Sequence, residues 1–198
     1  MHEDQDHHGS QENVRALLES ASRLARQSDP FHFGTERQNR LPSTRQSQLA
    51  ALKSEQNAAL PPENVPNFTG GEHEVWIDNP PTTVLKHTLP GFYGRTVDEV
   101  NLLDPRTFQN RPRLTLRGAL PSEYLRRWAV LTDIFGLPTS YQGQTGSHPE
   151  GPQMAVAQPY IEQADDDPAT LEDISEFMEA HGFIKIDPQS LPCLKSLT

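Results

Sequence analysis

A glycine pair followed by two short strand-like segments is the part of the sequence best suited to chemistry. Gly70 and Gly71 precede residues 73–78, and after a proline-rich turn residues 82–88 carry a single lysine, Lys86. A glycine turn lets backbone N–H groups approach a phosphate, and a lysine on the next strand can neutralise phosphate charge. Gly70, Gly71 and Lys86 are therefore candidate phosphate-binding residues. The alternative is an ordinary hairpin whose Lys86 faces water.

Two further residues extend this candidate site. Val75 follows the glycines on the first strand, and Glu123 lies near the start of a predicted helix over residues 121–135. A glutamate on that helix could hold Lys86 in place through an ion pair. The alternative for Glu123 is that the helix dipole alone favours an acidic residue in the first turn.

The elements that must position these residues indicate a small α+β domain over residues 63–186. Strand-like segments lie at residues 73–78, 82–88, 139–142 and 154–161, with a short one at 114–116, and helical patterns at 121–135 and 170–181. The order is hairpin, helix, two strands, helix. Strands that are close in sequence favour an antiparallel sheet with helices on one side.

The segment before this domain, residues 1–62, is polar and carries two weakly apolar helical patterns, at about residues 10–28 and 43–60. Neither helix would be stable alone at this length. They therefore dock on the rest of the chain, pair with a partner, or fray, and we expect the segment to be partly disordered. The domain boundary is expected between Pro61 and Pro66, and residues 187–198 are expected to form a tail.

The charge distribution restricts the classes of partner. The net charge is −10, and residues 128–184 contain ten acidic residues and no Lys or Arg. Nucleic acid is therefore not the expected partner of this third of the chain, because phosphate contacts need Lys or Arg. A basic protein partner fits this charge, although a solvated acidic face is the commoner reason for it.

Other classes of site find little support in the sequence. The single cysteine, Cys193, cannot form an intramolecular disulfide or a cysteine-based zinc site. The acidic N-terminus is unlike a signal peptide, and no apolar run approaches the ~20 residues that span a bilayer, so we expect a cytoplasmic protein and no membrane. The N-terminal histidines, or His73 with His87 across the hairpin, could approach a metal ion, but we expect no metal site.

A set of short motifs, in order along the chain, resembles the polyvalent protein kinase family, kinase-like regions of bacterial, phage and mobile-element proteins. The resemblance covers about residues 67–186 and implies a kinase N-terminal lobe. In such a lobe Gly70 and Gly71 would cover the phosphates of ATP, Lys86 would contact them and Glu123 would position Lys86. The motifs are Glu72 to Val75, the Lys86 strand, Pro90 to Gly94, Pro121 to Arg127, Phe135-Gly136, Gln158 to Tyr160 and Ile174 to Phe183.

The resemblance also implies what such a lobe would lack. A working kinase needs a catalytic-loop Asp with a downstream Asn and a metal-binding Asp, and only twelve residues follow Ile186. Asp133-Ile134-Phe135-Gly136 has one residue more than the metal-binding Asp-Phe-Gly. We therefore expect a module without catalytic activity that retains weak ATP binding. The alternatives are a protein-interaction adaptor using the N-terminal helices and the acidic third, or a truncated piece of a larger kinase-like protein.

Overall fold

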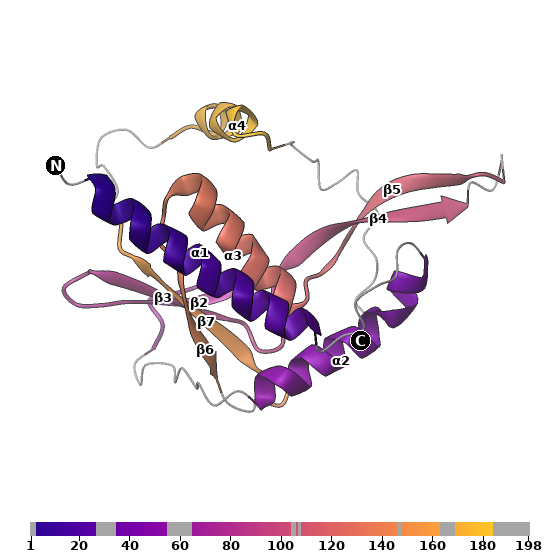
Figure 1. Cartoon of the computed structure of the whole chain (residues 1–198), viewed down its shortest axis with the longest axis horizontal. Coiled ribbons are helices and arrows are strands. Elements are labelled where there is room, and N and C mark those ends of the chain that lie inside the picture. The colour runs from indigo at the N-terminus through magenta and orange to yellow at the C-terminus, as the bar shows by residue number, and fades with distance from the viewer. Residues whose placement is uncertain are drawn as a thin grey trace.

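A computed structural model shows an α+β fold built on a five-stranded antiparallel sheet (Figure 1). It describes residues 3–26, 35–54, 65–103, 106, 108–145, 148–162 and 169–183. The helices are α1 (Glu3–Arg26), α2 (Thr35–Lys53), α3 (Pro121–Phe135) and α4 (Leu171–Ala180). The strands are β1 (Phe68–Thr69), β2 (His73–Ile77), β3 (Thr83–Thr88), β4 (Arg95–Leu103), β5 (Asn110–Gly118), β6 (Ser140–Thr145) and β7 (Gln153–Pro159). Within these residues no helix combines the length and hydropathy needed to cross a membrane.

The sheet has the order β1-β2-β3-β7-β6, and every neighbouring pair in it is antiparallel. The predicted hairpin of β2 and β3 is therefore confirmed, and the two later strands complete the same sheet. The register aligns one row of side chains across all five strands, because side chains directly opposite each other share a face. That row consists of Phe68, Val75, Lys86, Val156 and Tyr141.

Helix α3 covers the predicted residues 121–135. Side chains other than that of its N-cap residue accept the free N–H groups at its start. Its N-cap is Leu120, whose side chain cannot accept a hydrogen bond, so the Glu123 carboxylate accepts the Leu120 N–H at 2.8 Å instead. The Gln48 side chain of α2 accepts the Ser122 N–H at 3.1 Å. Gly136 ends the helix with a φ of 63°, a left-handed conformation that favours glycine.

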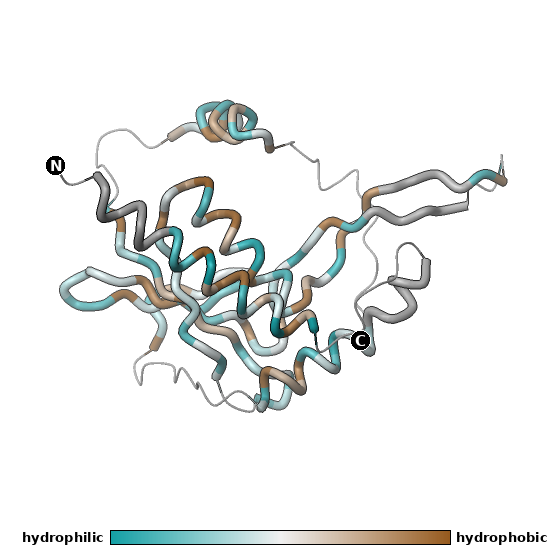
Figure 2. Tube along the Cα trace, in the orientation of Figure 1, coloured by the Kyte–Doolittle hydropathy of each residue, from teal (hydrophilic) through white to brown (hydrophobic). Residues whose placement is uncertain are grey.

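The N-terminal helices share a core with the sheet. Leu17, Ala21 and Leu24 of α1 and Leu52 of α2 are fully buried, in one cluster with Leu125 of α3. Their spacing places the α1 residues on one face, and Figure 2 shows apolar positions alternating with polar ones along α1. These helices were expected to dock on the rest of the chain, pair with a partner or fray, and their described residues dock on the rest of the chain. The expected boundary at Pro61 to Pro66 falls largely outside the described residues, which omit residues 55–64.

The second sheet is a long hairpin that the sequence did not reveal. Strands β4 and β5 pair over nine positions each and project away from the body of the molecule (Figure 1). Only residues 114–116 were predicted as a strand here, since charged residues interrupt the alternation of the rest. Val97 and Leu114 are exposed on this hairpin, and a buried ion-pair cluster at its base joins it to α3.

The turn between β3 and β4 is held against the loop before β7. Gly91 has a φ of 65°, and a Cβ there would overlap the carbonyl oxygen of Glu150. The Tyr93 hydroxyl donates to the Pro152 carbonyl at 2.7 Å, and Arg45 of α2 donates to the Gly91 carbonyl at 2.8 Å. These contacts fix the end of the strand that carries Lys86.

Candidate anion site around Lys86

Lys86 lies at the centre of the sheet on the face that α3 covers. Val75 of β2 is directly opposite it on one side and Val156 of β7 on the other, so the structure brings two of the predicted site residues together. The Lys86 Nζ atom lies 5.0 Å from the centre of the Trp128 ring, within cation–π range. Burial lowers the pKa of Lys86 below its usual value. No described carboxylate forms an ion pair with it.

The same face of the sheet carries a histidine that contacts aromatic residues of α3. His73 of β2 lies on the same face and has its Nε2 atom 3.0 Å from the Tyr124 hydroxyl of α3. The His73 ring also approaches the Trp128 ring, with centres 6.0 Å apart. Burial and, next, the charge of Lys86 lower the pKa of His73 to about 4. At neutral pH His73 is therefore uncharged, and the cations beside these rings are Lys86, over Trp128, and Arg127, over Tyr124.

The lowered pKa of His73 predicts a pH-dependent stability. An unfolded histidine titrates near a pKa of about 6.5, so between about pH 6.5 and 4 the unfolded chain binds more protons than the folded one. Stability should fall as the pH drops through this window, by about 1–2 kcal/mol between pH 7 and 5 after allowance for partial solvent screening. Urea unfolding at both pH values measures it. His73→Gln should reduce the dependence, and the buried His87, whose pKa burial also lowers, should account for part of what remains. Substitution of the exposed His148 by Gln is the control.

Glu123 lies in a different ion-pair cluster from the one expected. Its carboxylate accepts two hydrogen bonds from the guanidinium of Arg117, at 2.7 and 2.8 Å. The Arg117 Nε atom donates to Asp98 of β4 at 3.0 Å. Arg117 is buried, and its fork of donors matches two carboxylates in a way that lysine cannot. Glu123 therefore anchors the β4–β5 hairpin to α3, and the predicted pairing with Lys86 is replaced by this cluster.

The glycine turn lies where it was predicted, between β1 and β2, and of its two glycines Gly70 already uses its backbone N–H. The Gly70 N–H donates to the His73 carbonyl at 2.8 Å. Neither glycine has the left-handed φ that would require glycine, and a Cβ on Gly71 would meet nothing within 4 Å. The space beside Gly71 is open, so its backbone remains accessible to a ligand.

An ion pair between this turn and α3 is the main feature that sequence reasoning missed. Glu72, directly after the glycines, pairs with Arg127. Its Oε1 atom also lies 3.9 Å from the His73 Nε2 atom. Both residues belong to motifs of the family resemblance. Only the fold could show that they meet, because 55 positions separate them.

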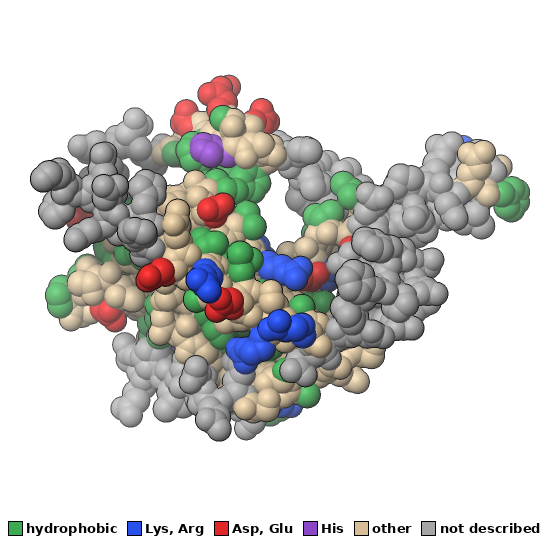
Figure 3. All heavy atoms as spheres, viewed as in Figure 1, with side chains coloured by type: hydrophobic (Ala, Val, Ile, Leu, Met, Phe, Trp, Pro, Cys, Tyr) green, Lys and Arg blue, Asp and Glu red, His purple; other side chains and the backbone are tan. Residues whose placement is uncertain are grey.

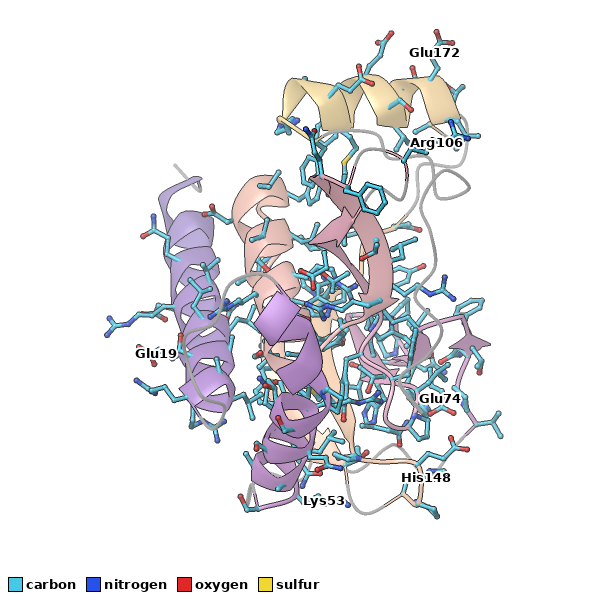
Figure 4. All side chains as sticks on the ribbon, turned by 90° about the vertical axis from the view of Figure 1, so that its right-hand side faces the viewer. Glu19, Lys53, Glu74, Arg106, His148 and Glu172 are labelled. Atoms are coloured by element: carbon cyan, nitrogen blue, oxygen red, sulfur yellow. The ribbon has the colours of Figure 1, made fainter. Side chains whose placement is uncertain are left out.

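The far face of the sheet carries a different set of side chains. His87 is opposite Glu74 in the register, whereas His73 is opposite Thr88, so the two histidines point to opposite faces and cannot share a metal ion. Figure 4 shows Glu74 on the side of the sheet away from α1 and α3. In the described part of the chain no group of three or more His, Cys, Asp or Glu residues is placed to hold a metal.

Comparison of the chain with family models, with curated proteins and with solved structures finds no match. The resemblance to a kinase-like family therefore stays a prediction that depends on the motifs.

The surface expected for an adaptor includes residues of α1 and of α4. Leu17, Ala21 and Leu24 of α1 are in the core, but α4 has no buried residue, and its Leu171 and Ile174 are exposed. Phe177 of α4 stacks on Phe135 of α3 with ring centres 5.7 Å apart. Figure 3 shows apolar side chains where α4 lies beside α3, and acidic ones on its outer side. Helix α4 is therefore one exposed part, within the described residues, of the surface assigned to an adaptor.

Proposed function

We propose that this chain is a kinase N-lobe-like module that binds the phosphates of a nucleotide and does not transfer them. The element order supports this proposal: a glycine turn between β1 and β2, a lysine on β3 and, after the inserted β4–β5 hairpin, a helix and two more strands of the same sheet. Protein kinases cover the nucleotide phosphates with a glycine-rich loop and carry the phosphate-binding lysine on β3.

The observation that carries the proposal is the state of Lys86. Its ammonium group is half-buried on the covered face of the sheet and has an aromatic ring, but no described carboxylate, beside it. Burial of a cation without a counter-charge costs free energy. A phosphate at Nζ would offset that cost, whereas the pairs of Arg117 and Arg127 are already satisfied by carboxylates. Lys86 is thus the residue most ready to accept an anion.

We expect no phosphoryl transfer because Glu123 is engaged by Arg117 and not by Lys86. Active kinases need the ion pair between the β3 lysine and a helix glutamate. Here both carboxylate oxygens of Glu123 accept hydrogen bonds from Arg117, and one also accepts the N-terminal N–H of α3. Moving Glu123 to Lys86 would leave Arg117 with one acid and would uncap the helix. Nucleotide binding without activation of the γ-phosphate is the function that fits this arrangement.

Fluorescence of Trp128 offers a test, because a phosphate that attracts Lys86 should move the ammonium relative to the indole. We expect Mg·ATP to change the tryptophan emission of the full chain with saturation at millimolar concentration or below. Lys86→Ala should abolish the change. The matched control is Lys53→Ala, which removes an exposed lysine at the end of α2 (Figure 4). A change that Lys86→Ala leaves intact, or that persists in Trp128→Phe, contradicts the proposal.

A further inference from the structure

The ion pair of Glu72 and Arg127 closes the glycine turn onto α3. Glu72 directly follows Gly71, and its carboxylate reaches the Arg127 guanidinium across the end of the sheet. The Glu72 carbonyl accepts the Leu89 N–H at 2.9 Å, which fixes the backbone at the same point. A Cβ on Gly94, whose φ is 82°, would overlap both charged side chains. The packing thus leaves room for this pair and holds it in one place.

Solvent reaches this pair, and the pair adjoins the Lys86 site. About a third of each side chain is exposed, 29% for Glu72 and 34% for Arg127. The Glu72 Oε1 atom lies 3.9 Å from the His73 Nε2 atom. The Lys86 Nζ atom and the His73 ring both lie beside the Trp128 ring, 5.0 Å and 6.0 Å from its centre. The carboxylate and the Lys86 ammonium are therefore both neighbours of His73.

Arginine recognises carboxylates and phosphates with the same planar set of donors. The Glu72 carboxylate occupies a position at Arg127 that a phosphate oxygen could take. A polyphosphate would carry more negative charge than one carboxylate and would meet Lys86 and Arg127 instead of Arg127 alone. Glu72 would then be displaced toward solvent, where its charge is hydrated.

We propose, building on the proposed function, that Arg127 is a second phosphate-binding residue of the Lys86 site and that Glu72 competes with the ligand for it. The ligand class is a polyphosphate, either nucleoside-linked or free. The ion pair acts as a latch that keeps the glycine turn closed until a sufficiently charged anion displaces it. Removing the carboxylate should therefore strengthen binding, which is the opposite of what loss of a structural contact alone would do.

Calorimetric titration of the full chain with Mg·ATP, and separately with tripolyphosphate, tests this proposal. We expect Glu72→Gln to lower the Kd for both ligands by about fivefold, as removal of one adjacent like charge allows. Arg127→Gln should raise the Kd by about tenfold, as loss of a charge-assisted pair allows. Glu74→Gln is the matched control, because Glu74 lies on the face of the sheet opposite to that of Lys86. The Glu74→Gln protein should bind both ligands with the Kd of the wild type. Tightening for Mg·ATP alone would show that the nucleoside contributes to recognition.

The outcomes separate this proposal from the function on which it rests. If the wild type binds in a Lys86-dependent manner but Glu72→Gln binds no tighter than Glu74→Gln, the competition is refuted and the proposed function stands. If Arg127→Gln binds with the affinity of the wild type, Arg127 is not a phosphate-binding residue, and the proposed function again stands. If neither the wild type nor Glu72→Gln binds either ligand in a Lys86-dependent manner, both proposals fail. Circular dichroism of each variant confirms that the compared proteins are folded.

Discussion

Replacing Arg117 by Met is expected to lower the free energy of unfolding by about 3–5 kcal/mol, the cost of leaving buried charge unpaired. The buried Arg117 guanidinium pairs with both Asp98 and Glu123. Without it Asp98 and Glu123 lose the buried cation that they share, near the base of the β4–β5 hairpin. The hairpin should then detach from α3. Urea unfolding followed by circular dichroism measures the change.

Two further variants show whether charge or packing is responsible. Adding Asp98→Asn and Glu123→Gln to Arg117→Met removes the unpaired charge and should recover part of the lost stability. Arg126→Met, on the exposed side of α3, should change stability by less than about 0.5 kcal/mol. An Arg117→Met protein as stable as the Arg126→Met protein would show that this cluster does not hold the hairpin.

Replacing Leu24 by Ala in α1 is expected to cost about 2–5 kcal/mol, the usual cost of a cavity at a fully buried leucine. Leu24 lies in one cluster with Leu17, Leu52 and residues of α3. A helix that is merely an N-terminal appendage would tolerate the same change. The measurement is again the free energy of unfolding, with Leu18→Ala as control, since Leu18 is on the same helix and 43% exposed.

The Leu24 result decides whether α1 belongs to the folded unit. If Leu24→Ala and Leu18→Ala both change stability by less than about 1 kcal/mol, α1 does not contribute to the core. A large cost for Leu24→Ala alone would establish one cooperative unit that includes residues before the expected boundary at Pro61 to Pro66.

Much of the sheet could be predicted because its strands are short, alternating and bounded by turn residues. The β2–β3 hairpin and helix α3 lie where the sequence places them. Helix α3 combines Pro121 at its start, an apolar stripe and Gly136 at its end, and these three local signals agree. Hydrophobic periodicity also predicted an apolar face on α1, although it could not say that the rest of this same chain covers that face.

The parts that the sequence did not predict depend on contacts between distant residues. Sequence spacing allows Glu123 to pair with Lys86 or with Arg117. In the fold it accepts two hydrogen bonds from Arg117, whose planar guanidinium matches a carboxylate better than a lysine ammonium does. Strands β4 and β5 have charged residues on both faces, so alternation is weak and only the pairing register reveals them. The Glu72–Arg127 pair likewise arises from a β-turn and a helix that meet only in three dimensions.

The central claim is that Lys86 is the group that receives a phosphate. Its most direct test is titration calorimetry of the full chain with Mg·ATP, with Lys86→Ala and Lys53→Ala in parallel. The account predicts saturable heat for the wild type and for Lys53→Ala, and at least about tenfold weaker binding for Lys86→Ala, since a charge-assisted contact is lost. No heat from the wild type at millimolar Mg·ATP, or equal affinity in all three proteins, would contradict it.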